Sequence, residues 1–261
     1  MIKISAIIIA KNAEALLADC IDSVSFCDEI IVIDDGSKDR TYEIAKHLGA
    51  KAFYFRKESF SEKRNYGLKK AKGKWILYID TDERVSTELK NNILRVVEKD
   101  KAEYATYKLQ RKNFYFGNYE WPYVEKLERL FKKSSLQTWQ GALHETPVVK
   151  GDIGELEGNL LHYSHRDLTS MVEKTIEWSK IEAELRFNSH HPKMSWWRFF
   201  RVMITGFYDS YIKQEGWRLG TAGLVESIYQ SYSIFITYAR LWELQNNVNK
   251  SKADKEQSAK T

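Results

Sequence analysis

The sequence places three acidic side chains directly after a bulky apolar run. Residues 75–79 read Trp-Ile-Leu-Tyr-Ile, and Asp80, Asp82 and Glu83 follow at once. The run is rich in aromatic and β-branched residues without helical spacing, which predicts a strand buried on both faces. Unpaired carboxylates beside an apolar core are costly, whereas Mg²⁺ or Mn²⁺ binds carboxylate oxygens and shares them with phosphates. The pattern therefore favours a cation site, although a solvated turn capped by Asp80 would explain an isolated D-x-D.

Other polar groups follow the apolar runs at 4–10 and 29–33. The first run ends in Lys11-Asn12, and the second in Asp34-Asp35-Gly36-Ser37. In parallel sheets, ligands bind beyond the carboxyl ends of the strands, so we expect these groups to converge with Asp80 and Asp82. An acidic side chain at this edge could accept hydrogen bonds from a ribose hydroxyl or a uracil N–H. The same residue types also favour a plain turn.

The apolar spacing predicts the elements that position these groups. Strands are expected at 4–10, 29–33, 52–55 and 75–79, and helices at 13–24, 41–48, 60–71 and 87–99. This alternation implies an α/β fold with a mostly parallel sheet covered on both faces. Later strands are expected at 104–109, 127–131 and 160–163, around an aromatic loop at 114–123, and helices at 170–187, 196–214 and 221–244. We expect a domain over 1–165, a helical extension over 166–245 and a disordered tail over 246–261.

The composition of the chain limits the classes of protein to which it can belong. The 261 residues are 43% hydrophobic and 30% charged, which suits a globular core, and the net charge of +5 fits an anionic ligand or membrane surface without demanding nucleic acid. Two cysteines, Cys20 and Cys27, indicate reduced thiols in a cytoplasmic protein. The first ten residues do not resemble a signal peptide, and the uncharged stretch 227–239 is too short to span a bilayer. No dinucleotide or P-loop motif occurs.

Four segments, taken in order, resemble family 2 glycosyltransferases of the GT-A fold, a Rossmann-like, mostly parallel sheet with helices on both faces. They are Ile7–Asn12, Asp34–Thr41, Arg64-Asn65-Tyr66-Gly67 and Asp80-Thr81-Asp82-Glu83. Two later segments, Trp139-x-Gly141-x-x-His144-Glu145 and His162-Tyr163-Ser164-His165-Arg166, are similar to lipopolysaccharide core glucosyltransferases of the WaaE type. The resemblance covers about residues 1–165. It implies inverting transfer from a nucleotide sugar, usually a UDP-sugar, with Mg²⁺ or Mn²⁺ as cofactor.

The resemblance also implies roles for single residues. It places Asp35 and Arg64 at the uridine, Asp80 near the ribose and the metal, and Asp82 on the metal. The expected nucleotide-sugar contacts are Ala10, Asn12, Asp34, Asp35, Arg64, Asp80 and Thr81. His162 is a further candidate metal ligand, because neutral imidazole binds transition ions well. A lone histidine at a strand end is more often only hydrogen-bonded.

The reaction needs a cation that neutralises the departing diphosphate and a base that takes the acceptor hydroxyl's proton. Glu145 is our candidate base, because it follows a glycine-containing bend and lies far along the chain from the acidic pair. The alternative is that His144-Glu145 is an ion-pairing surface turn. Glu125, Glu128 and Asp152 are the next candidates for the base.

The region 196–217 interleaves aromatic and basic residues. A stripe at helical spacing contains Trp197, Phe200, Ile204, Phe207 and Tyr211, with Arg198 and Arg201 alongside. One interpretation is packing on the catalytic core or on another subunit of a homo-oligomer. Another is insertion into a membrane surface with anionic lipid. Single-stranded nucleic acid, which also binds aromatics beside arginines, is the least favoured partner, and we expect none.

We therefore expect an inverting glycosyltransferase that moves a sugar from a UDP-sugar to a lipid-linked or lipopolysaccharide-core saccharide. It would work in the cytoplasm, peripherally on the inner face of the cytoplasmic membrane. A protein or peptide glycosyltransferase is the alternative within the class. An enzyme that makes sugar nucleotides by nucleotidyl transfer would need a glycine-rich phosphate loop after the first strand, where this chain has Lys11-Asn12. A non-catalytic carbohydrate-binding module would not need the Asp80 and Asp82 pair.

Overall fold

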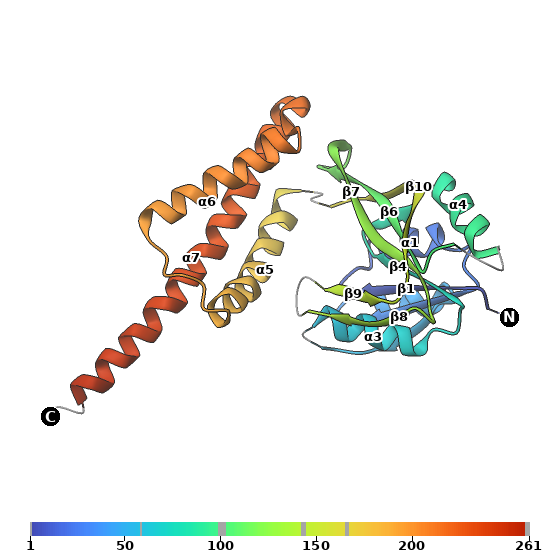
Figure 1. The fold of residues 1–261 in the computed structure, drawn as a ribbon, viewed down its shortest axis with the longest axis horizontal. Helices are drawn as coiled ribbons and strands as arrows, with labels where there is room; N and C mark the ends of the chain where they lie inside the picture. Colours follow the sequence, from blue (N-terminus) through green and yellow to red (C-terminus); the bar gives the residue numbers. More distant parts are fainter. Residues whose placement is uncertain (1, 58, 99–102, 142–144, 165–166, 259–261) are drawn as a thin grey trace. The chain divides into compact units, whose positions relative to one another are not determined.

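The computed structural model describes residues 2–57, 59–98, 103–141, 145–164 and 167–258, with side chains described up to residue 247. Two compact units are present (Figure 1). The α/β unit comprises Met1–Asn113 and Val124–Ser164, and the helical unit comprises Phe114–Tyr123 and His165–Thr261. The short segment 114–123 therefore belongs with the helices, although we expected it to form a loop of the first domain.

The elements of the first half alternate between strand and helix as expected. They are β1 Ile4–Ala10, α1 Leu17–Ser23, β2 Glu29–Asp34, α2 Thr41–His47, β3 Lys51–Tyr54, α3 Phe60–Lys70, β4 Trp75–Asp80, β5 Glu83–Val85 and α4 Thr87–Glu98. The strands that follow are β6 Thr106–Tyr115, β7 Tyr119–Lys132, β8 Leu136–Gln140, β9 Thr146–Val149 and β10 Ile153–His162. The helical unit contains α5 Leu168–Asn188, α6 Trp196–Tyr208, a π-helical turn Asp209–Lys213, a 3₁₀ turn Gly216–Leu219 and α7 Gly220–Ser258.

Eight strands form one sheet in the order β3-β2-β1-β4-β7-β6-β10-β5. Strands β3, β2, β1 and β4 are parallel to one another, β7 is antiparallel to β4, and β10 is parallel to β6. The expected mostly parallel sheet is therefore confirmed. Strands β8 and β9 form a separate antiparallel pair.

Side chains of the central strands alternate between two hydrophobic clusters, one on each face of the sheet. On β1, Ile7 belongs to one cluster and Ile8 to the other, and on β4, Tyr78 and Leu77 divide in the same way. Helices α1, α2 and α4 contribute to the cluster of Ile8, whereas residues at the end of α3 and on β8 contribute to that of Ile7. Helices therefore cover both faces (Figure 1), which explains why these strands are continuous apolar runs.

The structure differs from expectation mainly in its second half. The expected aromatic loop is the turn of a long β6–β7 hairpin, and the segment at Trp139 is a strand paired with β9, where we expected a break. Helix α7 continues through Ser258, whereas we expected helix only to about Leu244 and a disordered tail beyond. The polar residues added there include good helix formers, and extending an existing helix costs far less than nucleating one.

Within the helical unit, α5 and α6 both pack on α7. The tip of the hairpin is anchored here by Trp121, which is 1% exposed and donates its indole N–H to Gln214 Oε1 at 3.0 Å. A Cβ added at Gly216 would lie 2.6 Å from the Trp121 ring, so only glycine permits this packing. No helix among the described residues is long and apolar enough to cross a membrane.

Candidate active site

The expected site residues gather at the carboxyl ends of three neighbouring strands. Ala10 of β1 is in register with Asp34 of β2, and Ile9 is in register with Asp80 of β4. The Ala10 carbonyl also accepts the N–H of Asp35 at 2.8 Å. The parallel sheet therefore brings these strand ends together, as the sequence predicted.

The loops after β1 and β2 hold each other in place. Asp34 Oδ1 accepts the N–H groups of Gly36 and Ser37, both at 2.8 Å. Ser37 Oγ accepts the N–H of Asn12 at 2.9 Å, and Asn12 Oδ1 accepts the N–H of Lys38 at 2.8 Å. Asp34 Oδ2 is buried and has no hydrogen-bond partner in the described part of the chain. Asp34 thus shapes the loop with one oxygen and retains capacity for a ligand donor on the other.

Asp35 is paired with a lysine that sequence reasoning missed. Lys63 of α3 donates to Asp35 Oδ2 at 2.6 Å, and both residues are buried. Lys63 also lies over the Phe60 ring, 4.4 Å from its centre. A lysine in a helix rich in polar residues is usually exposed, so only the folded arrangement reveals this pair.

Arg64 joins the end of β4 to the candidate base. Its Nε donates to Glu145 Oε1 at 2.8 Å, and its Nη2 lies 3.3 Å from Asp80 Oδ1. The guanidinium packs over the rings of Trp139 and Tyr78, 4.9 and 5.4 Å from their centres. The structure therefore brings three expected site residues together, although Glu145 is 81 positions from Arg64 in the chain.

The rest of the Arg64-Asn65-Tyr66-Gly67 segment fixes this arrangement. Asn65 donates to the carbonyl of Trp139 at 2.9 Å and accepts its N–H at 2.8 Å. This pairing holds the end of β8, and with it the approach to Glu145, against α3. A Cβ added at Gly67 would lie 2.6 Å from Ile7 Cγ2, so the glycine lets α3 approach β1 closely.

Arg129 of β7 forms a buried charge cluster with Asp80 and Glu83. Its Nη2 lies 2.6 Å from Asp80 Oδ2 and 2.9 Å from Glu83 Oε1, and Glu83 Oε2 accepts the N–H of Asp80 at 2.9 Å. Glu83 is 0% and Arg129 5% exposed. Burial raises the pKa of Asp80, but Arg129 and Arg64 lower it further, so this pKa lies well below its usual range. Burial lowers the pKa of Arg129, but Asp80 and Glu83 raise it above its usual range.

A second branch of the cluster orients His162. Arg111 contacts Glu83 at 3.2 Å and Glu125 at 2.5 Å. Asn113 donates its amide N–H to Glu125 at 2.9 Å. This bond turns the amide oxygen of Asn113 toward His162 Nδ1, which is 2.7 Å away. Nδ1 therefore donates to Asn113, and Nε2 lies 3.4 Å from Asp82 Oδ2.

This donor set fits a divalent cation when a bound ligand completes the coordination. Asp82 and His162 offer a carboxylate oxygen and an imidazole nitrogen, and an amide behind a ligating histidine is the support that metal sites use. Each carboxylate oxygen of Asp80, the third candidate ligand, contacts an arginine in this structure. Across the part of the chain that the structure describes, no group of three His, Cys, Asp or Glu residues forms a metal site. Nucleotide phosphates would have to supply the other oxygens.

The remaining expected residues are placed as follows. Thr81 lies in the turn after β4, where its carbonyl accepts from Arg84 Nη1 at 2.8 Å. His144, His165 and Arg166 lie outside the described residues. Of the next candidates for the base, Glu125 is bonded to Arg111 and Asn113. Glu145, in contrast, accepts a hydrogen bond from Arg64, which is expected at the nucleotide.

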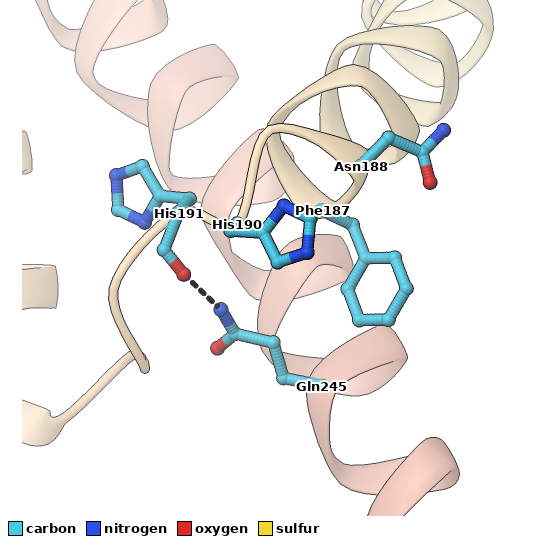
Figure 2. A pocket seen from close by; sticks show the side chains of 5 residues that line it. All are labelled: Phe187, Asn188, His190, His191 and Gln245. Carbon is cyan, nitrogen blue, oxygen red and sulfur yellow. Dashed lines mark hydrogen bonds between the residues drawn. The ribbon is translucent and has the colours of Figure 1, made fainter.

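A pocket in the helical unit is separate from these residues. It is lined by Phe187, Asn188, His190, His191 and Gln245 (Figure 2). The Gln245 amide donates to the His191 carbonyl at 3.0 Å and accepts the N–H of Met194 at 2.9 Å. These bonds hold the connection between α5 and α6 against α7, so we assign this pocket a structural role.

An α/β sheet whose strand ends gather carboxylates and arginines is the architecture of an enzyme with an anionic ligand. The sequence profile of Glycosyl transferase family 2 matches residues 5–151. The chain is 31% identical to an uncharacterized glycosyltransferase of Rickettsia typhi, over 94% of this chain and 88% of that protein. It is 24% identical to the lipopolysaccharide core biosynthesis glycosyltransferase LpsC of Rhizobium meliloti, over 92% of each. The structure of S. aureus TarS 1–349 with UDP-GlcNAc covers 94% of this chain, with 12% identity and a TM-score of 0.48.

The chain belongs to glycosyl transferase family 2, and it is a glycosyltransferase with a GT-A fold and a C-terminal helical extension. The expectations for the family, the fold and the enzyme class are thereby confirmed.

Proposed function

We propose that this enzyme transfers a sugar, with inversion, from a UDP-sugar to a lipid-linked or lipopolysaccharide-core saccharide. The observation that carries the proposal is the bonding of Arg64 to both Glu145 and Asp80. It joins the candidate base to the strand ends where the nucleotide is expected. A binding module without chemistry would not need a carboxylate at this position.

The donor's uridine would bind at the ends of β1, β2 and β4. Asp34 and Asp35 supply acceptors for ribose or uracil donors, and Asn12 fixes the loop around them. Ala10 and Thr81 would contribute backbone groups beside the uracil and the ribose of the donor. Arg64 would turn to a phosphate of the donor, because guanidinium–phosphate bonds are charge-assisted and directional.

This movement of Arg64 would also prepare the base. Glu145 accepts from Arg64 in the structure, and an occupied carboxylate is poorly placed to take a proton from an acceptor hydroxyl. Donor phosphates that draw Arg64 away would release Glu145 for that proton. The donor would then bind before the acceptor.

Asp82 and His162 would hold Mg²⁺ or Mn²⁺. When bound, the cation would neutralise charge on the departing diphosphate. Asp80 would face the ribose while Arg129 keeps its carboxylate ionised and Glu83 accepts its backbone N–H.

We expect UDP with Mn²⁺ to raise the melting temperature. Ligand that binds only the folded state, at a hundredfold excess over Kd, adds about 2.7 kcal/mol to the free energy of unfolding. Asp82→Asn should remove most of this gain, whereas the exposed control Asp22→Asn should keep it. Differential scanning calorimetry with and without EDTA makes the comparison. An equal rise in EDTA would exclude a role for the metal in UDP binding.

The acceptor is proposed from the family resemblance and from the name of the similar protein LpsC. Such acceptors are lipid-anchored, so the enzyme would work at the inner face of the cytoplasmic membrane. A radiolabelled donor supplied with truncated lipopolysaccharide, lipid-linked saccharides or peptides tests this choice. We expect label in a lipid-extractable or lipopolysaccharide product. Label in the peptide instead would show a protein glycosyltransferase.

A further inference from the structure

We propose that the helical unit is built to lie in the surface of a bilayer containing anionic phospholipid, with its exposed apolar side chains among the acyl chains. This inference deepens the proposed location of the enzyme, on which it rests, by identifying the surface and the lipid. Four observations within the helical unit lead to it.

First, exposed large apolar residues are concentrated in the helical unit. Among the described residues, Leu48, Tyr54 and Ile153 are the exposed large apolar residues of the α/β unit, and all others belong to the helical unit. The most continuous series recurs every fourth residue along α6 and the turn after it: Trp196, Phe200, Ile204, Tyr208 and Ile212. Trp196, Phe200 and Ile204 are 76%, 62% and 67% exposed. Apolar surface of this extent marks an interaction site.

Where α6 packs on α7, small residues lie beside the ring of Phe199, which is 5.8 Å from that of Phe235. Val202, Gly206 and Ser210, also four apart, are buried against α7. A Cβ added at Gly206 would lie 2.5 Å from Ile234 Cδ1, so the two helices approach as closely as glycine allows. Ser210 Oγ is 3.0 Å from Ser227 Oγ of α7.

Hydroxyl groups also fill the contact between α5 and α7. Thr175 Oγ1 lies 2.6 Å from the Tyr229 hydroxyl and 3.2 Å from Ser233 Oγ. Ser179 and Thr237 are buried in the same unit. Small and hydroxylated residues thus make these contacts, beside a small apolar cluster of Ala183, Met194 and Leu241. Many of the other large apolar residues of the unit are exposed. Apolar side chains exposed in this way on a helix surface are typical of helices that lie in a bilayer interface.

We expect the helices of this unit to lie in the plane of the membrane. No described helix is long and apolar enough to span a bilayer. Basic residues select anionic lipid over a second copy of the chain. Residues 196–208 contain Arg198 and Arg201 but no acidic residue, and neither arginine forms an ion pair within the described residues. Their guanidinium groups lie 4.9 and 6.0 Å from the exposed Trp197 ring. Two copies meeting on this face would bring these unpaired cations together, whereas lipid phosphates would neutralise them.

Co-sedimentation with vesicles tests the proposal on the full chain without any sugar donor. Phosphatidylglycerol–phosphatidylcholine vesicles should bind the protein, and pure phosphatidylcholine vesicles should bind it at least about tenfold more weakly. Phe200→Ser with Ile204→Ser should weaken binding at least about tenfold. Arg198→Gln with Arg201→Gln should weaken it mainly on the anionic vesicles and abolish much of its salt dependence. Leu48→Ser with Ile153→Ser, which removes exposed apolar side chains from the α/β unit, should bind like the native chain.

Circular dichroism and light scattering on the same samples keep the outcomes distinct. The Phe200→Ser, Ile204→Ser variant and the Arg198→Gln, Arg201→Gln variant should both keep the native helix content and the native rate of UDP-sugar hydrolysis. Absence of vesicle binding by the native chain would overturn the inference, as would a native dimer that the Phe200 and Ile204 changes split into monomers. Vesicle binding by a protein that hydrolyses no UDP-sugar would leave this inference standing and overturn the proposed function.

Discussion

Glu145→Gln is expected to lower kcat by about 10²–10⁴-fold, the usual loss when a general base is removed. Glutamine keeps the shape of the side chain but cannot take the acceptor's proton. UDP affinity should be retained or rise, because Glu145 accepts from Arg64 at 2.8 Å, and a neutral amide would compete less with phosphates for that arginine. Steady-state transfer rates and calorimetric UDP titration measure the two effects.

The exposed Glu155→Gln provides the control, since Glu155 pairs with Lys126 on the surface. It should transfer sugar at the native rate. If Glu145→Gln also turns over normally, the base is another residue, with Glu125, Glu128 and Asp152 next to be tested.

Arg129→Met is expected to lower the free energy of unfolding by about 3–5 kcal/mol. Removing one partner of a buried ion pair has this effect because it leaves poorly compensated charge, here on Asp80 and on the fully buried Glu83. Each keeps a longer contact with another arginine, Asp80 with Arg64 at 3.3 Å and Glu83 with Arg111 at 3.2 Å. Urea unfolding measures the change. The exposed Arg95→Met, whose guanidinium donates to Asn92 on the surface, should stay within about 0.5 kcal/mol of the native chain. A similarly small loss in Arg129→Met would show that the cluster is not needed for folding.

The ion pair between Asp80 and Arg129 also predicts that the free energy of unfolding depends on pH. The folded-state pKa of Asp80 is depressed from 3.8, with burial raising it and Arg129 and Arg64 lowering it more. The stability that Asp80 contributes is therefore fully present above about pH 4 and is lost as the pH falls further. Arg129→Met removes the stronger of the two attractions. The difference in stability between the native chain and Arg129→Met should thus be largest near neutral pH and narrow in acid, as urea unfolding at several pH values would show.

The strands and strand ends of the first half could be predicted because short-range patterns determine them. The run Trp75–Ile79 is apolar at every position, and Asp80 follows it whatever the rest of the chain does. Lys63 and Arg129 could not be predicted, because their partners depend on which strands and helices become neighbours. Arg129 reaches Asp80 only because β7 inserts beside β4 in the antiparallel direction.

The helical unit shows a second limit of prediction from sequence. Helical spacing predicted the stripe that contains Phe200 and Ile204, and the structure shows both exposed. Spacing alone could not say which face of α6 would pack on α7, because an amphipathic helix normally buries its large residues. On α6 the buried residues are Val202 and Gly206, whereas Phe200 and Ile204 stay exposed.

The most direct test of the central claim is UDP release from a panel of UDP-sugars by the purified full-length chain, with Mn²⁺ and then with EDTA. We predict that one or two UDP-sugars are turned over, at least by slow hydrolysis, that release stops in EDTA, and that Glu145→Gln, although it binds UDP, lowers acceptor-dependent transfer. No release from any UDP-sugar, with Mn²⁺ present and a lipopolysaccharide acceptor added, would contradict the assignment of this site to transfer from UDP-sugars.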